Sequence, residues 1–294
     1  MTPTRAHLVE RAVERLGGQA IIQGGAARPG MTAPPIANDL GGGLAGIGPA
    51  RIVDPIAMDL LLNAGLAAAP HLRTRSRLLE ELSIMQHQVL RSATDDTPRG
   101  RVVLVTSSLP AEGKTFIALN LAASIATSGG RRVVLVDADG KRGGISHVLG
   151  VADAQGLYAL AMNPAHRPEA LVHPTALKRL MFMAFGARLQ EGVDLTAGGT
   201  MGAAVTRLAE AFPDAIVVLD TPPCLSTSDA SALASIAGQV VMVVNAERTQ
   251  RNEVEAALDM MEACPTLQLL LNRVRLTAND TFGAYGDYGA PDAG

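Results

Sequence analysis

Gly113, Lys114 and Thr115 have the residue types and the order of a phosphate-binding loop. They follow the apolar run "RVVLVT" and open the helical stretch "TFIALNLAASIATSG", which is the strand-to-helix setting that this motif requires. Backbone N–H groups at a helix N-terminus bind phosphate oxygens, the lysine ammonium reaches the β- and γ-phosphates, and the threonine hydroxyl can ligate Mg²⁺. Ser108 stands where the general pattern has its first glycine, so only the second half matches. These residues predict a nucleotide phosphate site.

Three carboxylates close apolar runs elsewhere in the chain. Asp137 and Asp139 end "VVLVDAD", and Asp220 ends "IVVLD". Because the carboxyl ends of parallel strands lie along one edge of a sheet, we expect these acids to converge near the phosphate loop and to meet one metal ion. Asp220 has the position expected of the acidic residue that binds Mg²⁺, directly or through a water molecule, in P-loop proteins. The alternative is that a strand-ending aspartate only caps the helix that follows it.

The elements that must position these residues are also visible in the sequence. The runs "RVVLVT", "RRVVLVDAD", "DAIVVLDT", "GQVVMVV" and "LQLLLN" do not alternate and are separated by helical stretches. This pattern predicts an α/β fold with a doubly wound, mostly parallel sheet covered on both faces. We expect a domain with a leading helix at 72–275, an amphipathic N-terminal helix at 1–20, a flexible Gly/Pro/Ala-rich linker at 21–71, and a flexible tail at 276–294.

Charge and hydropathy exclude some functions. The net charge of -3 and the pI near 6.1 give no field that would hold nucleic acid or an anionic membrane. The chain has no uncharged apolar run long enough to span a membrane and no apolar signal-peptide segment, so we expect a cytoplasmic protein.

Tyr285 and Tyr288, two of only three tyrosines, lie in the glycine-rich tail, where an extended backbone would remain accessible.

Four segments together resemble a known family. "TSSLPAEGKT", "VVLVDADGKR", "IVVLDTPP" and the C-terminal "YGDYG" resemble the bacterial tyrosine kinases of the capsular and exopolysaccharide family, and most closely the exosortase-associated tyrosine autokinases. The resemblance covers roughly residues 75 to 290. It implies a P-loop NTPase of the MinD/ParA-like type that uses ATP and Mg²⁺. It also implies a protein-tyrosine autokinase that regulates exopolysaccharide synthesis or export.

The resemblance also assigns roles to residues. It places catalysis on Lys114, Asp137 and Asp139, where the two acids serve Mg²⁺ and activate the tyrosine hydroxyl. Mg²⁺ itself is expected on Thr115, Asp139 and Asp220. The tail tyrosines, Tyr285 and Tyr288, would be the phosphate acceptors, and Asn272 with Arg273 would meet the nucleotide base. The full set of expected nucleotide contacts is Pro110, Ala111, Glu112, Gly113, Lys114, Thr115, Phe116, Asn272 and Arg273.

Partners follow from the same resemblance. It implies activation by a separate, membrane-embedded polysaccharide chain-length regulator, which would recruit the kinase to the inner face of the membrane. It also implies self-association through the leading helix, where the family carries a glutamate and two arginines; here Glu80 is followed by Ser83 and Gln86. Ala111 stands where the family has glycine. A non-catalytic, nucleotide-binding regulatory subunit therefore remains an alternative. A MinD/ParA-like ATPase would have a signature lysine where this chain has Leu109.

The position of the tail bears on how transfer would occur. We expect "LQLLLN" to end four or five strands from the phosphate loop, or on the order of 20 to 25 Å. The stretch from Arg275 to Tyr285 spans at most about 33 to 36 Å when extended. A nearly taut tail loses most of its freedom to align a hydroxyl, which predicts transfer between two chains.

Overall fold

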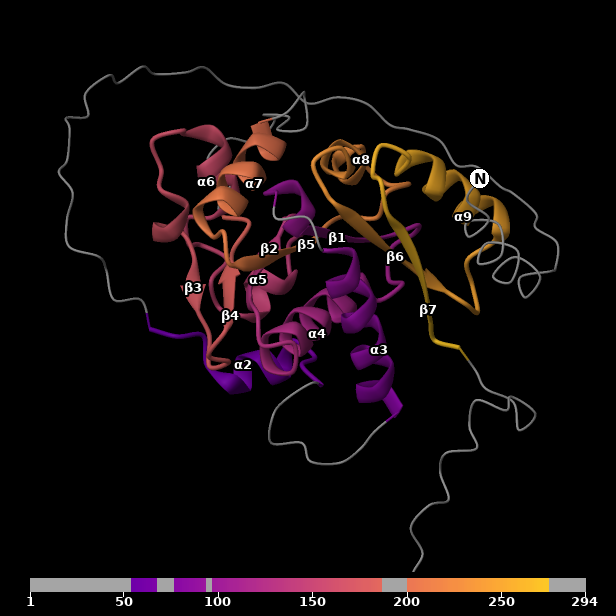
Figure 1. Cartoon of the computed structure of the whole chain (residues 1–294), viewed down its shortest axis with the longest axis horizontal. Coiled ribbons are helices and arrows are strands. Elements are labelled where there is room, and N and C mark those ends of the chain that lie inside the picture. The colour runs from indigo at the N-terminus through magenta and orange to yellow at the C-terminus, as the bar shows by residue number, and fades with distance from the viewer. Residues whose placement is uncertain (1–53, 68–76, 94–96, 187–199, 275–294) are drawn as a thin grey trace, which may run out of the picture.

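Figure 1 shows the computed structural model of the chain, which describes residues 54–67, 77–93, 97–186 and 200–274. The strands are β1 (Val102–Ser107), β2 (Arg132–Asp137), β3 (His173–Pro174), β4 (Leu180–Met183), β5 (Ala215–Asp220), β6 (Gln239–Asn245) and β7 (Leu267–Asn272). The α-helices are α2 (Met58–Asn63), α3 (Arg77–Ser92), α4 (Lys114–Thr127), α5 (Ile145–Val148), α6 (Leu157–Met162), α7 (Thr200–Ala211), α8 (Asp229–Ala234) and α9 (Arg251–Met260). Two short 3₁₀ helices are η1 (Arg99–Arg101) and η2 (Pro168–Ala170).

The strands form one sheet in the order β3-β4-β2-β5-β1-β6-β7. All neighbouring pairs are parallel except β3 with β4. The predicted doubly wound, mostly parallel sheet is therefore confirmed. The five apolar runs became β1, β2, β5, β6 and β7, whereas the short strands β3 and β4 were not predicted.

Both faces of the sheet are covered, which is why its strands read as continuous apolar runs. Val103 and Val105 of β1 belong to one core, and Val102 and Leu104 belong to the other. Helices α2, α3, α4 and α5 pack into the first core, and α6, α7, α8 and α9 pack into the second (Figure 1). The carboxyl ends of the parallel strands thus form one common edge.

The last strand lies closer to the phosphate loop than the sequence suggested. Only β6 separates β7 from β1, a distance of about 10 Å at the usual strand spacing, so the predicted separation of four or five strands is wrong. Strand order depends on long-range packing, which the apolar runs do not encode. The chain that follows β7 is longer than this distance requires. The length of the tail therefore no longer favours transfer between chains.

Residues 54–67 differ from the linker predicted for 21–71. Ile56 forms a bridge to Thr175 beside β3, and Leu61 is 1% exposed in the first core. Asn120 of α4 fixes the end of this segment, because its side chain accepts from Ala67 N at 2.7 Å and donates to Gly65 O at 3.0 Å. The apolar side chains of 54–67 need burial, and the first core provides it.

The packing of α2 predicts a clear difference between two neighbouring leucines. Leu61→Ala should lower the free energy of unfolding by about 2 to 5 kcal/mol, because it leaves a cavity in the core. Leu62, on the same helix, is 41% exposed, and Leu62→Ala should change stability by less than about 0.5 kcal/mol. Urea unfolding of both variants measures the difference. Equal, small effects would mean that α2 is a linker after all.

Gln86 of the leading helix α3 does not lie on the surface. It is 1% exposed. In the amide orientation that satisfies its neighbours, its nitrogen donates to Ser124 Oγ at 2.6 Å and its oxygen accepts from Gly129 N at 3.1 Å. This side chain thus binds the C-terminal end of α4 and is unavailable to a second chain. Ser83 is partly exposed and Glu80 is exposed.

Several expectations lie outside the described residues. These are the helix at 1–20, the tail at 276–294 and the acceptors Tyr285 and Tyr288. Among the helices that the structure does describe, none has both the length and the apolar character needed to cross a membrane.

Candidate nucleotide-binding site

The loop between β1 and α4 has the backbone of a phosphate-binding turn. Ala111 and Gly113 both have left-handed φ angles, 66° and 99°. A Cβ at Gly113 would also lie 2.3 Å from Asn272 Nδ2, so a larger residue there would displace that side chain. Ala111 adopts its angle at a cost of roughly 1 to 2 kcal/mol relative to an ordinary conformation. Lys114 then begins α4, so the helix N-terminus faces the loop.

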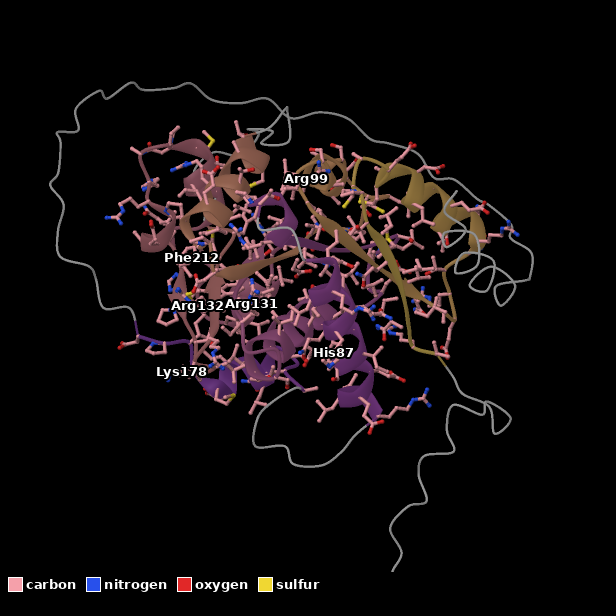
Figure 2. All side chains as sticks on the ribbon, in the orientation of Figure 1. His87, Arg99, Arg131, Arg132, Lys178 and Phe212 are labelled. Carbon is pink, nitrogen blue, oxygen red and sulfur yellow. The ribbon has the colours of Figure 1, made fainter. Side chains whose placement is uncertain are left out.

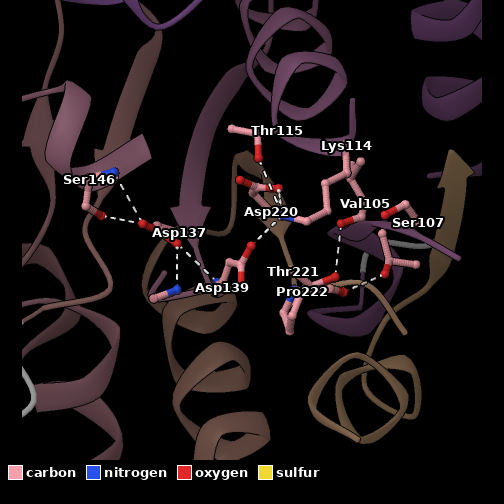
Figure 3. Close-up of polar contacts among 12 residues, drawn as sticks. Val105, Ser107, Lys114, Thr115, Asp137, Asp139, Ser146, Asp220, Thr221 and Pro222 are labelled. Carbon is pink, nitrogen blue, oxygen red and sulfur yellow. Dashed lines mark hydrogen bonds and ion pairs between the residues drawn. The ribbon is translucent and has the colours of Figure 1, made fainter. Parts of the chain in front are cut away.

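Lys114 lies between two carboxylates (Figure 3). Its Nζ is 2.5 Å from Asp139 Oδ2 and 3.5 Å from Asp220 Oδ1. Burial lowers the pKa of Lys114, but the negative charges of Asp220 and Asp139 outweigh it and raise the pKa above its usual value. The side chain is therefore a fixed ammonium at the mouth of the phosphate loop.

Asp220 is a buried acid at the centre of this cluster. It is 1% exposed and pairs in register with Asp137 across β5 and β2. Burial is the largest cause of its pKa of about 7, which Lys114 lowers and the charge of Asp137 raises. The Thr115 hydroxyl also hydrogen-bonds its carboxylate. The structure thus brings the three predicted acids to one edge, beside the phosphate loop.

Asp137 makes more hydrogen bonds than the sequence indicated. Its Oδ1 accepts from Asp139 N and Gly140 N, both at 3.1 Å, and its Oδ2 accepts from Ser146 Oγ at 2.6 Å and Ser146 N at 3.3 Å (Figure 3). Ser146 is the second residue of α5, so Asp137 hydrogen-bonds the first turn of that helix, whose N-cap residue is Gly144. Ser146 was not among the predicted site residues. Asp137 thereby fixes the loop that carries Asp139.

A pocket of about 620 Å³ opens at this edge, a volume typical of small-molecule sites. Of the predicted residues, it is lined by Pro110, Ala111, Gly113, Lys114, Thr115, Asp137, Asp139, Asp220 and Arg273. Its wall also includes residues that were not predicted, namely Ala64, Lys141, Gly143, Gly144, Ile145, Val148, Pro222, Pro223, Ser226 and Thr227. Ala64 follows α2, so the segment 54–67 contributes directly to the wall.

Three of the predicted nucleotide contacts do not line this pocket. Phe116 packs toward the turn at Gly65, where a Cβ would lie 3.3 Å from its ring. Asn272 Nδ2 donates to Glu112 O at 2.8 Å, so it touches the back of the phosphate loop. The Glu112 side chain is buried. The segment 54–67 and the end of β7 approach the phosphate loop and its helix from distant parts of the sequence. This approach is not apparent from the local sequence, which explains these differences.

Proteins similar to this chain include named bacterial tyrosine kinases. EpsB of Ralstonia nicotianae, named as a tyrosine-protein kinase, is 34% identical over 173 residues, which are 59% of this chain and 22% of EpsB. The succinoglycan biosynthesis transport protein ExoP of Rhizobium meliloti is 30% identical over 192 residues, which are 64% of this chain and 24% of ExoP. This chain thus spans about a quarter or less of either relative. No protein-family model matches it.

A solved structure shows where the fold recurs. The kinase domain of the Escherichia coli tyrosine kinase ETK matches with a TM-score of 0.57 at 21% identity, covering 68% of this chain and 76% of that domain. The chain shares the fold of this kinase domain. Together with the parallel sheet, this likeness confirms the predicted α/β fold class.

The residues at the edge suit a Mg²⁺ ion that arrives with phosphates. Thr115, Asp139 and Asp220 present hard oxygen atoms around the Lys114 ammonium. Across the described ranges, no three acidic, histidine or cysteine side chains could hold a metal by themselves. Mg²⁺ typically takes one or two carboxylates and completes its shell with phosphates and water. These side chains therefore fit a metal that is shared with a nucleotide.

Proposed function

We propose that this protein is an ATP-dependent protein-tyrosine autokinase that regulates the synthesis or export of an exopolysaccharide. The observation that carries the proposal is the Lys114 ammonium, held between Asp139 and Asp220 at the mouth of a phosphate loop. The shared fold of a tyrosine kinase domain supports it, as do the names of EpsB and ExoP. We further propose, on the resemblance alone, that it is of the exosortase-associated type.

Each side chain has a task in this proposal. Lys114 places a positive charge beside the transferring phosphoryl group, and the N–H groups of the loop bind the phosphate oxygens. Thr115, Asp139 and Asp220 hold Mg²⁺, which offsets the negative charge of the phosphates. Asp137 or Asp139 accepts the proton of the attacking tyrosine. Arg273, which lines the pocket, meets the base, whereas Asn272 supports the phosphate loop through its bond to Glu112 O.

The proposed acceptors are Tyr285 and Tyr288. The last described residues before the tail include Arg273 in the pocket wall, and the stretch from Arg275 to Tyr285 can extend about 33 to 36 Å. The hydroxyls can therefore reach either their own pocket or that of a second chain. Gly283, Gly286 and Gly289 lie within two residues of the tyrosines and permit an extended backbone there.

We propose transfer between chains, because the resemblance implies self-association. The test mixes a Lys114→Met chain, tail intact, with an active chain truncated after Arg275, and maps phosphotyrosine after addition of ATP and Mg²⁺. Label should appear on Tyr285 or Tyr288 of the inactive chain. If that chain remains unlabelled while the full-length enzyme labels itself at a rate independent of its concentration, transfer occurs within one chain and no self-association is needed.

A non-catalytic, nucleotide-binding regulatory subunit is the second candidate, because Ala111 holds a left-handed angle that a glycine would adopt at less cost. A phosphotransfer assay separates the two functions. For the kinase, we propose that the activating partner is a separate, membrane-embedded chain-length regulator that recruits the protein to the inner face of the membrane. Adding the cytoplasmic segment of such a regulator should raise the labelling rate of the kinase.

A further inference from the structure

Glu112 belongs to the phosphate loop, yet its carboxylate is directed toward the connection between β6 and α9. The residue is 2% exposed. Its Oε1 accepts from Asn245 N at 2.9 Å and from the Thr249 hydroxyl, and its Oε2 accepts from Leu109 N at 2.7 Å. A buried carboxylate is costly unless its oxygens are hydrogen-bonded. Here both oxygens are satisfied, so the burial serves a specific set of contacts.

These contacts join the loop to a turn that is already fixed. Asn245 ends β6, and Thr249 precedes α9. Asn245 O accepts from Thr249 N at 3.0 Å, and Asn245 Oδ1 accepts from Glu247 N at 3.1 Å. The turn therefore presents the Asn245 N–H and the Thr249 hydroxyl in a set geometry. Glu112 is anchored to a rigid support outside the pocket.

The same carboxylate also sets the bend of the loop. Its bond to Leu109 N spans the residues Pro110 and Ala111, which line the pocket. Ala111 lies at the bend with its left-handed φ of 66°. On the main-chain side, Glu112 O accepts from Asn272 Nδ2 at the end of β7. The loop is therefore fixed through one residue to both β6 and β7.

We propose that Glu112 is a positioning residue for nucleotide phosphates and that Thr249 supports it from outside the pocket. The carboxylate keeps the loop in the bend that turns its N–H groups toward phosphate. If the loop is released, only a fraction of molecules has the binding-competent bend, and the apparent dissociation constant rises by the inverse of that fraction. The inference rests on the proposed nucleotide site and concerns phosphate affinity.

The decisive variant is Thr249→Val, because it removes one hydroxyl, keeps the side-chain shape and lies outside the pocket lining. We expect the dissociation constant for ADP with Mg²⁺, measured by calorimetry on the full chain, to rise about 3- to 10-fold. Thr249→Ser, which keeps the hydroxyl, should retain the wild-type affinity for ADP. Glu112→Gln should weaken binding about tenfold or more, because its amide nitrogen cannot accept from an N–H group.

Thr206→Val is the matched control. The Thr206 hydroxyl donates to Gly202 O within α7, away from the pocket, so its loss should leave ADP affinity unchanged. Thermal unfolding without nucleotide reports whether each variant folds. The proposal is overturned if a folded Thr249→Val chain binds ADP like the wild type, or if Thr206→Val weakens binding equally. Glu112→Gln tests the proposal only if that variant folds. If it does not fold, Thr249→Val alone decides.

This test is separate from that of the kinase proposal. A wild-type chain that binds ADP with Mg²⁺ but never transfers phosphate would end the kinase proposal and leave the role of Glu112 testable by calorimetry. A wild-type chain that binds no nucleotide would contradict both.

Discussion

Lys114→Met is expected to abolish tyrosine phosphorylation, by at least about 1,000-fold in rate. The ammonium lies 2.5 Å from Asp139 and 3.5 Å from Asp220. Its removal takes away the positive charge that would stabilise the transferring phosphoryl group. The fold should survive, because Asp220, with a pKa of about 7, can take up a proton when it loses its partner. Phosphotyrosine is measured after incubation with ATP and Mg²⁺, and folding by thermal unfolding.

Lys178→Met is the matched control for this prediction. Lys178, labelled in Figure 2, is exposed and precedes β4. Because β4 is parallel to β2, Lys178 lies at the amino edge of the parallel strands, opposite the edge with the phosphate loop. Its loss should leave the rate of phosphorylation unchanged. Undiminished transfer by Lys114→Met would contradict the assignment of the phosphate loop, whereas an equal loss in both variants would indicate an indirect effect of charge.

Asp137→Asn is expected to lower phosphotransfer by about 100-fold or more while nucleotide affinity stays within about tenfold. A general base acts on the chemical step more than on binding of the ground state. The comparison of the turnover rate with the dissociation constant for ADP and Mg²⁺ measures this difference. Joint loss of binding and transfer would make Asp137 a residue that organises the site rather than a base.

Ser146→Ala separates these two roles of Asp137. The Ser146 hydroxyl donates to Asp137 Oδ2 at 2.6 Å, so its removal disturbs the loop and keeps the carboxylate. If Asp137 is the base, Ser146→Ala should retain most of the transfer rate. If the hydrogen-bonded loop is what matters, Ser146→Ala should share much of the defect of Asp137→Asn.

Local patterns were sufficient to predict the sheet and its functional edge. Continuous apolar runs identify strands that are covered on both faces, and the residues that end them must lie along the carboxyl edge. Lys114, Asp137, Asp139 and Asp220 were therefore brought together as expected. These predictions depend only on strand direction, which a parallel sheet determines.

Contacts between distant segments could not be predicted in this way. The packing of 54–67 beside the pocket and the short distance from β7 to the phosphate loop both depend on long-range arrangement. The burial of Glu112 and Gln86 could not be predicted either, because polar side chains next to a motif or on a helix are ordinarily exposed. Here buried partners satisfy each of them.

Peptide mapping of phosphotyrosine by mass spectrometry tests the central claim most directly. The full chain is isolated from its native cells and analysed before and after incubation with ATP and Mg²⁺, beside the Lys114→Met chain. We predict phosphate on Tyr285 or Tyr288 that increases with ATP and is absent from the Lys114→Met chain when that chain is expressed without the wild type. A wild-type chain that binds ADP with Mg²⁺ but carries no phosphotyrosine before or after the incubation would contradict the kinase assignment.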